Sequence, residues 1–210
     1  MSTLSLDDRS ALRRLDEARL GPFHTRLLLV TGFCWLWAGF AVTVVGYIIP
    51  VLRGLWPVNA TQLGLIASAT MAGMAPGSVL AGVLSDRIGR RATLAWTMVY
   101  LSLTSLACAL AWNYPSLLAL RFVSGIGMGA VLPAASTLVS EYCPARNRGG
   151  LLVLLNGFWG LGGVVSALVG YGLIPRFGWK AGLLCGALAI LTLPLVLRYV
   201  PESLRFLIGH

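Results

Sequence analysis

Six long apolar stretches divide the chain, and this pattern constrains its fold more than any other feature of the sequence. A helix needs about 20 apolar residues to cross the roughly 30 Å hydrocarbon core of a bilayer. None of the stretches alternates in polarity as the strands of a membrane β-barrel do. We therefore predict six transmembrane helices, at about Leu27–Leu52, Gln62–Leu84, Thr93–Trp112, Ser116–Ser140, Leu151–Ile174 and Ala181–Val200.

The composition supports an all-α membrane protein and excludes two other classes. Hydrophobic residues make up 57% of the chain and charged residues 11%, whereas a soluble domain carries about 25% charged residues. A disordered chain is poor in apolar residues. The net charge of +9 does not indicate nucleic-acid binding, because the basic residues lie in short gaps between apolar stretches. A chain of this composition is expected to lie in a lipid bilayer.

The basic residues also predict how the helices are oriented, because cytoplasmic loops are enriched in arginine and lysine. If the N-terminus is cytoplasmic, the outer loops carry only Arg53, Arg176 and Lys180. We therefore predict a multi-pass protein of the cell (inner) membrane with both termini in the cytoplasm, and with residues 1–26 as a cytoplasmic tail. The inner segments then hold twelve arginines, namely Arg9, Arg13, Arg14, Arg19, Arg26, Arg87, Arg90, Arg91, Arg146, Arg148, Arg198 and Arg205.

A short pattern, R-x-G-x-[R/K], occurs twice and suggests an internal repeat. Residues 87–91 (RIGRR) follow the second predicted span, and residues 176–180 (RFGWK) follow the fifth. With three helices in each unit, the first of these loops is cytoplasmic and the second is external. The two units would have inverted topology, as in many secondary transporters.

The most distinctive short segment is residues 82–91, GVLSDRIGRR. Glycine permits a tight turn. Asp86 can accept hydrogen bonds from arginines or from the exposed N–H groups at the start of a helix. A positive-inside loop would explain the arginines, but it explains neither Asp86 nor the spacing of the glycines.

This segment resembles the signature of the major facilitator superfamily of transporters, G-x-L-x-D-r-x-G-r-[KR]. Residues 121–129 (RFVSGIGMG) are similar to its R-x-x-x-G-x-G-x-G motif in the fourth span. Residues 141–149 resemble the E-x-x-P-x-x-x-R-G loop of the sugar-porter-related branches. Residues 201–205 resemble the P-E-S-P-R of those branches, with leucine in place of the second proline. Residues 151–180 look most like bacterial nicotinate and aromatic-acid transporters.

The resemblance implies that residues 27–200 form one of two six-helix halves around a central site, and that residues 201–210 begin a central cytoplasmic loop. It also implies that charged residues on the inner face form salt bridges that hold the outward-facing conformation. The counterpart of Asp86 in the family also caps a helix of the other half. The residues that we expect to gate the transporter are Gly82, Asp86, Arg87, Gly89, Arg90, Arg91, Glu141, Arg148, Glu202 and Arg205.

Arg121 is the only ionisable residue well inside a predicted span. A charge at such a depth costs about 2.5–3.5 kcal/mol on insertion scales and is usually functional. The guanidinium either snorkels to the outer interface, about 9 Å away along the helix, or faces the cavity and pairs with the carboxylate of an organic anion. Gly125, Gly129 and Pro133 follow on the same face at four-residue spacing and would let a partner helix approach closely.

A second group of candidate substrate-binding residues shares one face of the fifth predicted span. Asn156 offers hydrogen bonds there, and Trp159 offers an aromatic wall for a ring-bearing substrate. Gly160 and Gly163 lie on the same face, and helix packing explains these glycines equally well. Tyr47 in the first span is a further candidate.

One departure from the family concerns coupling to an ion. The nicotinate-like and aromatic-acid branches carry two acids, D-x-x-D, in the first span, and this chain has Ala38 and Ala41 at those places. No predicted span contains Asp, Glu or His. Uniport, exchange and coupling from elsewhere in a complete transporter therefore all stay open.

Our leading hypothesis is a transporter half that moves a small organic anion, such as an aromatic or nicotinate-like carboxylate, by alternating access. Its partners would be the substrate and a second six-helix half, encoded downstream or on another chain. A sugar or another polar metabolite is the alternative substrate. The alternative function is a non-transporting regulatory or degenerate half that associates with another membrane protein. An enzyme is not expected, because no metal-ligand set or nucleophile–base pair is present, and we expect no cofactor and no metal.

Overall fold

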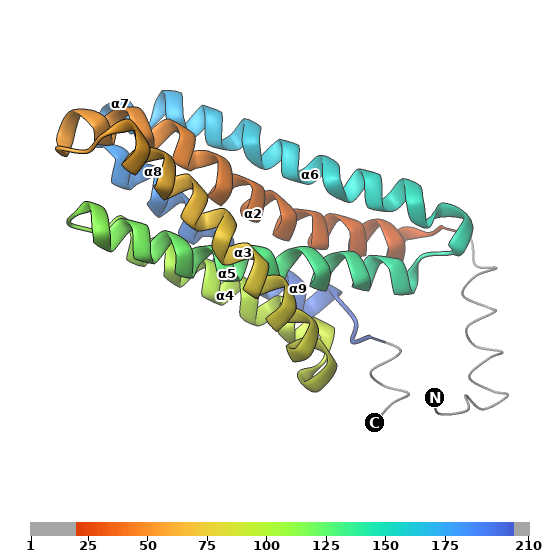
Figure 1. Cartoon of the computed structure of the whole chain (residues 1–210). Helices are drawn as coiled ribbons and strands as arrows, with labels where there is room; N and C mark the ends of the chain where they lie inside the picture. The colour runs from red at the N-terminus through yellow and green to blue at the C-terminus, as the bar shows by residue number, and fades with distance from the viewer. Residues whose placement is uncertain (1–19, 204–210) are drawn as a thin grey trace, which may run out of the picture.

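The computed structural model describes residues 20–203, and six helical spans account for nearly all of them (Figure 1). This part of the chain contains no strand. The prediction of an all-α fold with six helices that are long and apolar enough to cross a membrane is confirmed. The first five spans are α2 (Pro22–Leu55), α3 (Ala60–Ile88), α4 (Arg90–Ala109), α5 (Tyr114–Tyr142) and α6 (Ala145–Gly172). The short helix α7 (Ile174–Phe177) leads into the sixth span, which consists of α8 (Trp179–Gly186), the 3-10 segment η1 (Ala187–Thr192) and α9 (Leu193–Tyr199).

Local signals explain where several helices begin. Asn59 Oδ1 accepts a hydrogen bond from the Gln62 backbone N–H at 2.8 Å, and Asn113 Oδ1 accepts one from the Ser116 N–H at 2.9 Å. These caps satisfy N–H groups that have no partner within α3 and α5. At α2, proline occupies the first turn and the Gly21 N–H donates to His24 Nδ1 at 3.2 Å. The helix therefore begins at Pro22, and the end of the predicted tail 1–26 is helical; residues 1–19 lie outside the described residues.

The two copies of the repeated sequence adopt the same backbone turn. Gly89 ends α3 and begins α4 with a φ of 89°, and Gly178 ends α7 and begins α8 with a φ of 83°. They are the only residues between 20 and 203 with a positive φ. This region of backbone conformation is open to glycine and strained for most other residues. The repeat that the sequence suggested is therefore present in the fold.

Helix packing follows the same repeat. The two most extensive contacts join α3 to α5 and α2 to α6. In the repeat, α2 corresponds to α5 and α3 corresponds to α6, so each of these contacts is the counterpart of the other. Where α3 crosses α5, a Cβ added at Gly73 would overlap the carbonyl oxygen of Phe122, and one at Gly125 would overlap that of Thr70. The crossing of α2 and α6 is built in the same way. There, Gly162 faces the carbonyl oxygen of Leu36 and Gly39 faces that of Trp159.

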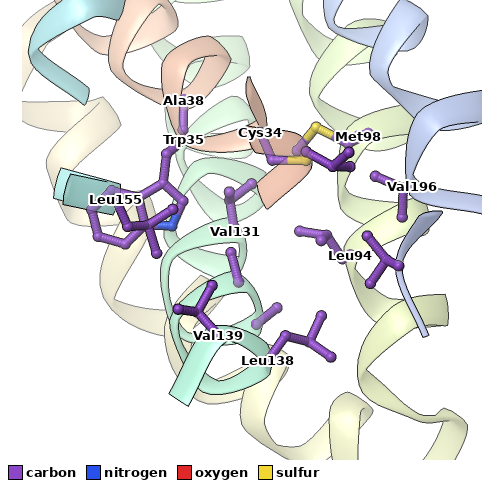
Figure 2. Packing of buried hydrophobic residues seen from close by; sticks show 14 of the residues in the cluster. Cys34, Trp35, Ala38, Leu94, Met98, Val131, Leu138, Val139, Leu155 and Val196 are labelled. Carbon is purple, nitrogen blue, oxygen red and sulfur yellow. The ribbon is translucent and has the colours of Figure 1, made fainter. Parts of the chain in front are cut away.

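Buried side chains from six elements (α2, α4, α5, α6, η1 and α9) form a packed cluster in the interior, part of which Figure 2 shows. Trp35 of α2 and Leu155 of α6 meet Val131 of α5, while Met98 of α4 and Val196 of α9 line the opposite wall. Lipid tails are as apolar as this core, so close packing rather than exclusion of water holds the helices together. The glycine crossings matter for this reason, since they bring the backbones near enough for dense packing.

We expect Gly73→Ala to destabilise the bundle by about 1–3 kcal/mol, because the added methyl group forces α3 and α5 apart. Equilibrium unfolding in detergent measures the change. Gly64→Ala is the matched control, because it lies on the same helix with nothing within 4 Å of its added Cβ. That substitution should leave the stability unchanged or raise it by up to about 1 kcal/mol. Equal effects of the two substitutions would contradict the packing described here.

Candidate functional site

The start of α4 is capped by a carboxylate from the other end of the described chain. Glu202 Oε1 accepts hydrogen bonds from the backbone N–H groups of Arg90 at 2.8 Å and Arg91 at 3.1 Å. These N–H groups have no partner within the helix, and a negative charge is favoured at a helix N-terminus. A Cβ on Gly89 would lie 2.7 Å from Glu202 Oε1. Glycine at this position therefore serves both the turn and the approach of the carboxylate.

A second carboxylate joins the same group of residues. Arg90 Nη1 lies 2.9 Å from Glu141 Oε1, with the two side chains 16% and 7% exposed. Ser203 Oγ donates a hydrogen bond to Glu141 Oε2 at 2.6 Å, and the Ser203 N–H donates to Glu202 Oε1 at 3.0 Å. Such a shielded ion pair is screened less by salt than a pair on an open surface.

The start of α2 and the end of α5 complete the group. The Tyr142 hydroxyl donates to the carbonyl oxygen of Glu202, and the carbonyl oxygen of Tyr142 lies 3.1 Å from His24 Nε2. The rings of Phe23 and Tyr142 meet edge to face, with centroids 5.6 Å apart. Arg91 Nη2 donates to the carbonyl oxygen of Leu197 in α9. We call this group the rim cluster: His24, Arg90, Arg91, Glu141, Tyr142, Glu202 and Ser203.

The rim cluster contains only part of the predicted gating set. Asp86, Arg87 and Arg148 are exposed, and Arg205 lies outside the described residues. Asp86 and Gly82 line a small pocket of 90 Å³ with Arg90 and Pro133. The helix that Asp86 is expected to cap belongs to the other half and is not part of the described bundle. Glu202 occupies the start of α4, because the segment after α9 passes directly over it.

Arg148 lies near the turn between α5 and α6 without joining the rim cluster. Burial raises the pKa of the Cys143 thiol in that turn, and the Arg148 guanidinium opposes the rise. All four cysteines of the chain are free thiols. Between residues 20 and 203, no three His, Cys, Asp or Glu side chains are grouped as metal ligands.

Arg121 lies inside the bundle. It is 2% exposed, and its Nη1 donates a hydrogen bond to the carbonyl oxygen of Ala41 in α2 at 3.1 Å. In the described structure the guanidinium is therefore packed between helices, rather than exposed at the outer surface or to an open cavity. Gly125 and Gly129, on the same helix, lie directly against the backbone of α3. The third residue of that face, Pro133, lies inside α5, where its carbonyl oxygen accepts a hydrogen bond from Thr137 Oγ1 at 2.6 Å.

The remaining candidates lie along α2 and α6. Asn156 is exposed, and its Nδ2 donates to the carbonyl oxygen of Leu152 at 2.9 Å. Trp159 is half-buried, and Gly160 has open space around it. Tyr47 is 41% exposed, and its ring covers Gly170 of α6. In the described structure, no hydrogen bond joins any of these residues to Arg121.

Sequence reasoning missed Trp35. It occupies the position in α2 that corresponds to Arg121 in the repeat, since the neighbouring Leu36 corresponds to Phe122. Its ring meets that of Trp159 edge to face, with centroids 6.4 Å apart. Its Nε1 is buried and has no hydrogen-bond partner among residues 20–203. Aligning the two repeat units along the sequence would have drawn attention to this residue.

Comparison with known proteins identifies the relatives of this fold. The sequence profile of the Major Facilitator Superfamily matches residues 28–206. The chain is 43% identical over 197 residues to the niacin transporter NiaP of Acinetobacter baylyi, covering 94% of this chain and 45% of that protein. It is 38% identical over 195 residues to the 4-hydroxybenzoate transporter PcaK of the same organism, covering 92% of this chain and 43% of the relative. The chain thus spans less than half the length of these relatives.

A solved structure shows the same fold. The inward-open xylose transporter XylE from E. coli superimposes with a TM-score of 0.78 at 22% sequence identity. The match covers 88% of this chain and 50% of that one.

We expect Glu202→Ala to loosen the start of α4, because two backbone N–H groups lose a charged acceptor. A lost helix cap of about 0.5–2 kcal/mol corresponds to amide exchange that is roughly 2- to 30-fold faster at Arg90 and Arg91. Hydrogen–deuterium exchange of the peptide around residue 90 measures this change. Glu202→Gln keeps a neutral acceptor and should have a smaller effect. Unchanged exchange in Glu202→Ala would contradict the cap.

Proposed function

The chain belongs to the Major Facilitator Superfamily, and on that premise we propose that it is the N-terminal six-helix half of a secondary transporter that moves a small organic anion across the membrane. Niacin and 4-hydroxybenzoate, the compounds for which two relatives are named, are both ring-bearing carboxylic acids. We propose the same class, an aromatic or nicotinate-like carboxylate, as the substrate here.

The burial of Arg121 is the observation that carries this proposal. Its guanidinium lies inside the bundle, whereas the two acidic residues of the described spans, Asp86 and Glu141, lie near the last residues of α3 and α5. A guanidinium pairs with a carboxylate through two parallel hydrogen bonds and more strongly than with a neutral acceptor. A substrate carboxylate would therefore be a better partner for Arg121 than the carbonyl of Ala41.

The hydrogen bond between Arg121 and the Ala41 carbonyl would link substrate binding to the movement of the helices. Ala41 stands where the resembling branches carry the second of their first-span acids, and here its backbone holds Arg121 Nη1. A substrate reaches the guanidinium only when α2 and α5 separate enough to release that bond. Alternating access provides such a rearrangement of packed helices. In this proposal, Trp159 flanks the ring of the substrate and Asn156 supplies a further hydrogen bond. Tyr47 packs on Gly170, about 16 Å further along α6 than Trp159, and is too far away to contact the same ring.

The rim cluster would act as the gate at its end of the bundle. Its contacts join α2, α4, α5 and the segment after α9. We propose that this end is cytoplasmic and that the intact cluster holds the outward-facing state. Opening towards the cytoplasm then requires the Arg90–Glu141 pair and the Glu202 cap to separate. Arg87, Arg148 and Arg205 would contribute to the gate through contacts outside the described bundle.

The second half of the transporter would pack against α3 and α6. These two helices are the least buried of the long spans and are equivalent in the repeat. Gly157 and Gly160 of α6 have nothing within 4 Å of an added Cβ, so packing within this bundle does not account for them. Asp86 is exposed at the end of α3 and is available to cap a helix of that half. From the distribution of arginine and lysine we propose that both termini lie in the cytoplasm and that the chain resides in the cell (inner) membrane.

We expect Arg121→Gln to reduce uptake of labelled nicotinate or 4-hydroxybenzoate at least tenfold in vesicles that carry this half together with its second half. Loss of one charged hydrogen-bonding partner accounts for a change of about that size. Arg121→Lys should retain part of the activity, since it keeps the charge without the fork-shaped donor. Arg53→Gln is the matched control, because it removes the same charge from an exposed position.

Two outcomes would overturn the proposal. Uptake that is unchanged in Arg121→Gln would exclude the guanidinium as the anion partner. Saturable uptake of xylose but of neither aromatic acid would favour the alternative class of substrate. Thermal unfolding of each variant in detergent, with and without substrate, separates loss of binding from loss of the fold.

A further inference from the structure

An apolar groove lies on the flank of the bundle, away from the candidate substrate site. It has a volume of 490 Å³ and is formed by α3, α4 and α5. Its walls include Leu80, Leu84 and Ile88 of α3 and Trp96 and Leu103 of α4, while small residues of α5 form its floor. The Trp96 side chain is 63% exposed and Leu103 is 61% exposed. The groove is thus open to whatever surrounds the spans.

The groove offers carbon atoms and almost no polar atoms to an occupant. Its two threonines bond to backbone carbonyls of their own helix: Thr93 Oγ1 to Gly89 and Thr97 Oγ1 to Leu94, both at 2.7 Å. The hydroxyl of Tyr100 is similarly engaged, since it donates to the Val123 carbonyl oxygen at 2.8 Å. An occupant would therefore be held by packing alone along the length of the groove.

Tyr100 also narrows the groove, one turn before Leu103, the last residue of α4 that lines it. Its ring crosses α5 at Gly127, where an added Cβ would lie 2.5 Å from Tyr100 Cδ1. From Gly77 to Ile88, the groove follows α3 for about 16 Å at a rise of 1.5 Å per residue. This is about half of the roughly 30 Å hydrocarbon core. An acyl chain from one leaflet fits that length, whereas a membrane-spanning helix of a partner would need a groove about twice as long.

The open end of the groove carries a positive charge, that of Arg87, which forms no ion pair with any residue between 20 and 203. Arg87 is exposed in the last turn of α3, next to Ile88 at the mouth. The neighbouring Arg90 is paired with Glu141. Asp86 lines the small pocket with Pro133 and Thr137 and no part of this groove. None of the described residues that line the groove is acidic, so a phosphate group at the mouth could pair with Arg87.

From these observations we propose that the groove is a binding site for an anionic phospholipid of the adjacent leaflet. One acyl chain lies along α3 and α4 as far as Tyr100, and the phosphate of the headgroup pairs with Arg87. The site would take phosphatidylglycerol in preference to a zwitterionic lipid with the same chains. This inference does not depend on which substrate the transporter carries.

Fluorescence quenching of Trp96 tests the proposal with the full chain in nanodiscs. Phosphatidylglycerol with brominated chains should quench the Trp96 component at roughly fivefold lower mole fraction than brominated phosphatidylcholine, the preference expected for one arginine beside an anionic headgroup. Trp96→Phe should remove this component. Trp112→Phe is the control, because Trp112 is also highly exposed, at 77%, and lies outside the groove.

Two further variants separate a specific site from general lipid contact. Arg87→Gln should abolish the preference for phosphatidylglycerol, and Arg87→Lys should retain it. Leu80→Phe should weaken quenching by filling the groove, whereas Leu65→Phe, on the exposed surface of the same helix near its other end, should not. Equal quenching by both lipids, or a preference that survives Arg87→Gln, would overturn the proposal.

Discussion

The bundle depends on two helix crossings in which a glycine of each helix lies against a carbonyl oxygen of the other. Gly73 and Gly125 form the crossing of α3 with α5, and Gly39 and Gly162 form that of α2 with α6. Within a bilayer, packing must supply the stability that exclusion of water supplies in a soluble core. Because the crossings occupy equivalent places in the two three-helix units, one packing solution is used twice and gives the half-transporter its internal symmetry.

The charges are concentrated at one end of this symmetric scaffold and break its symmetry. Gly89 and Gly178 make the same turn, but of these two turns only the one at Gly89 is followed by N–H groups that donate to a carboxylate, that of Glu202. The rim cluster therefore ties the segment after α9 to the start of α4 and the end of α5. The hydrogen bonds and the ion pair of the rim cluster stabilise one arrangement of the helix ends. They can break without disturbing the glycine crossings, as a gate in a transporter requires.

Much of the fold could be predicted from the sequence, because apolar length and the paired R-x-G segments are local signals. The short 3-10 segment within the sixth span and the start of α2 at Pro22 were not predicted, since both depend on local backbone contacts. Of the candidate site, the acidic and basic residues of the rim were found, but their pairing was not. The carboxylate that caps α4 belongs to Glu202, and only the path of the chain after α9 decides this.

The central claim is that two three-helix units lie in the membrane with opposite orientation, and labelling at equivalent positions of the two repeats tests it most directly. Arg87 and Arg176 are both exposed and occupy the same place in their R-x-G segments. Each is replaced by cysteine in turn and treated with a membrane-impermeant maleimide in right-side-out vesicles, with the unmodified chain as the blank. The account predicts that Arg176→Cys reacts in intact vesicles and that Arg87→Cys reacts only after permeabilisation. Reaction of both cysteines from the same side would contradict it.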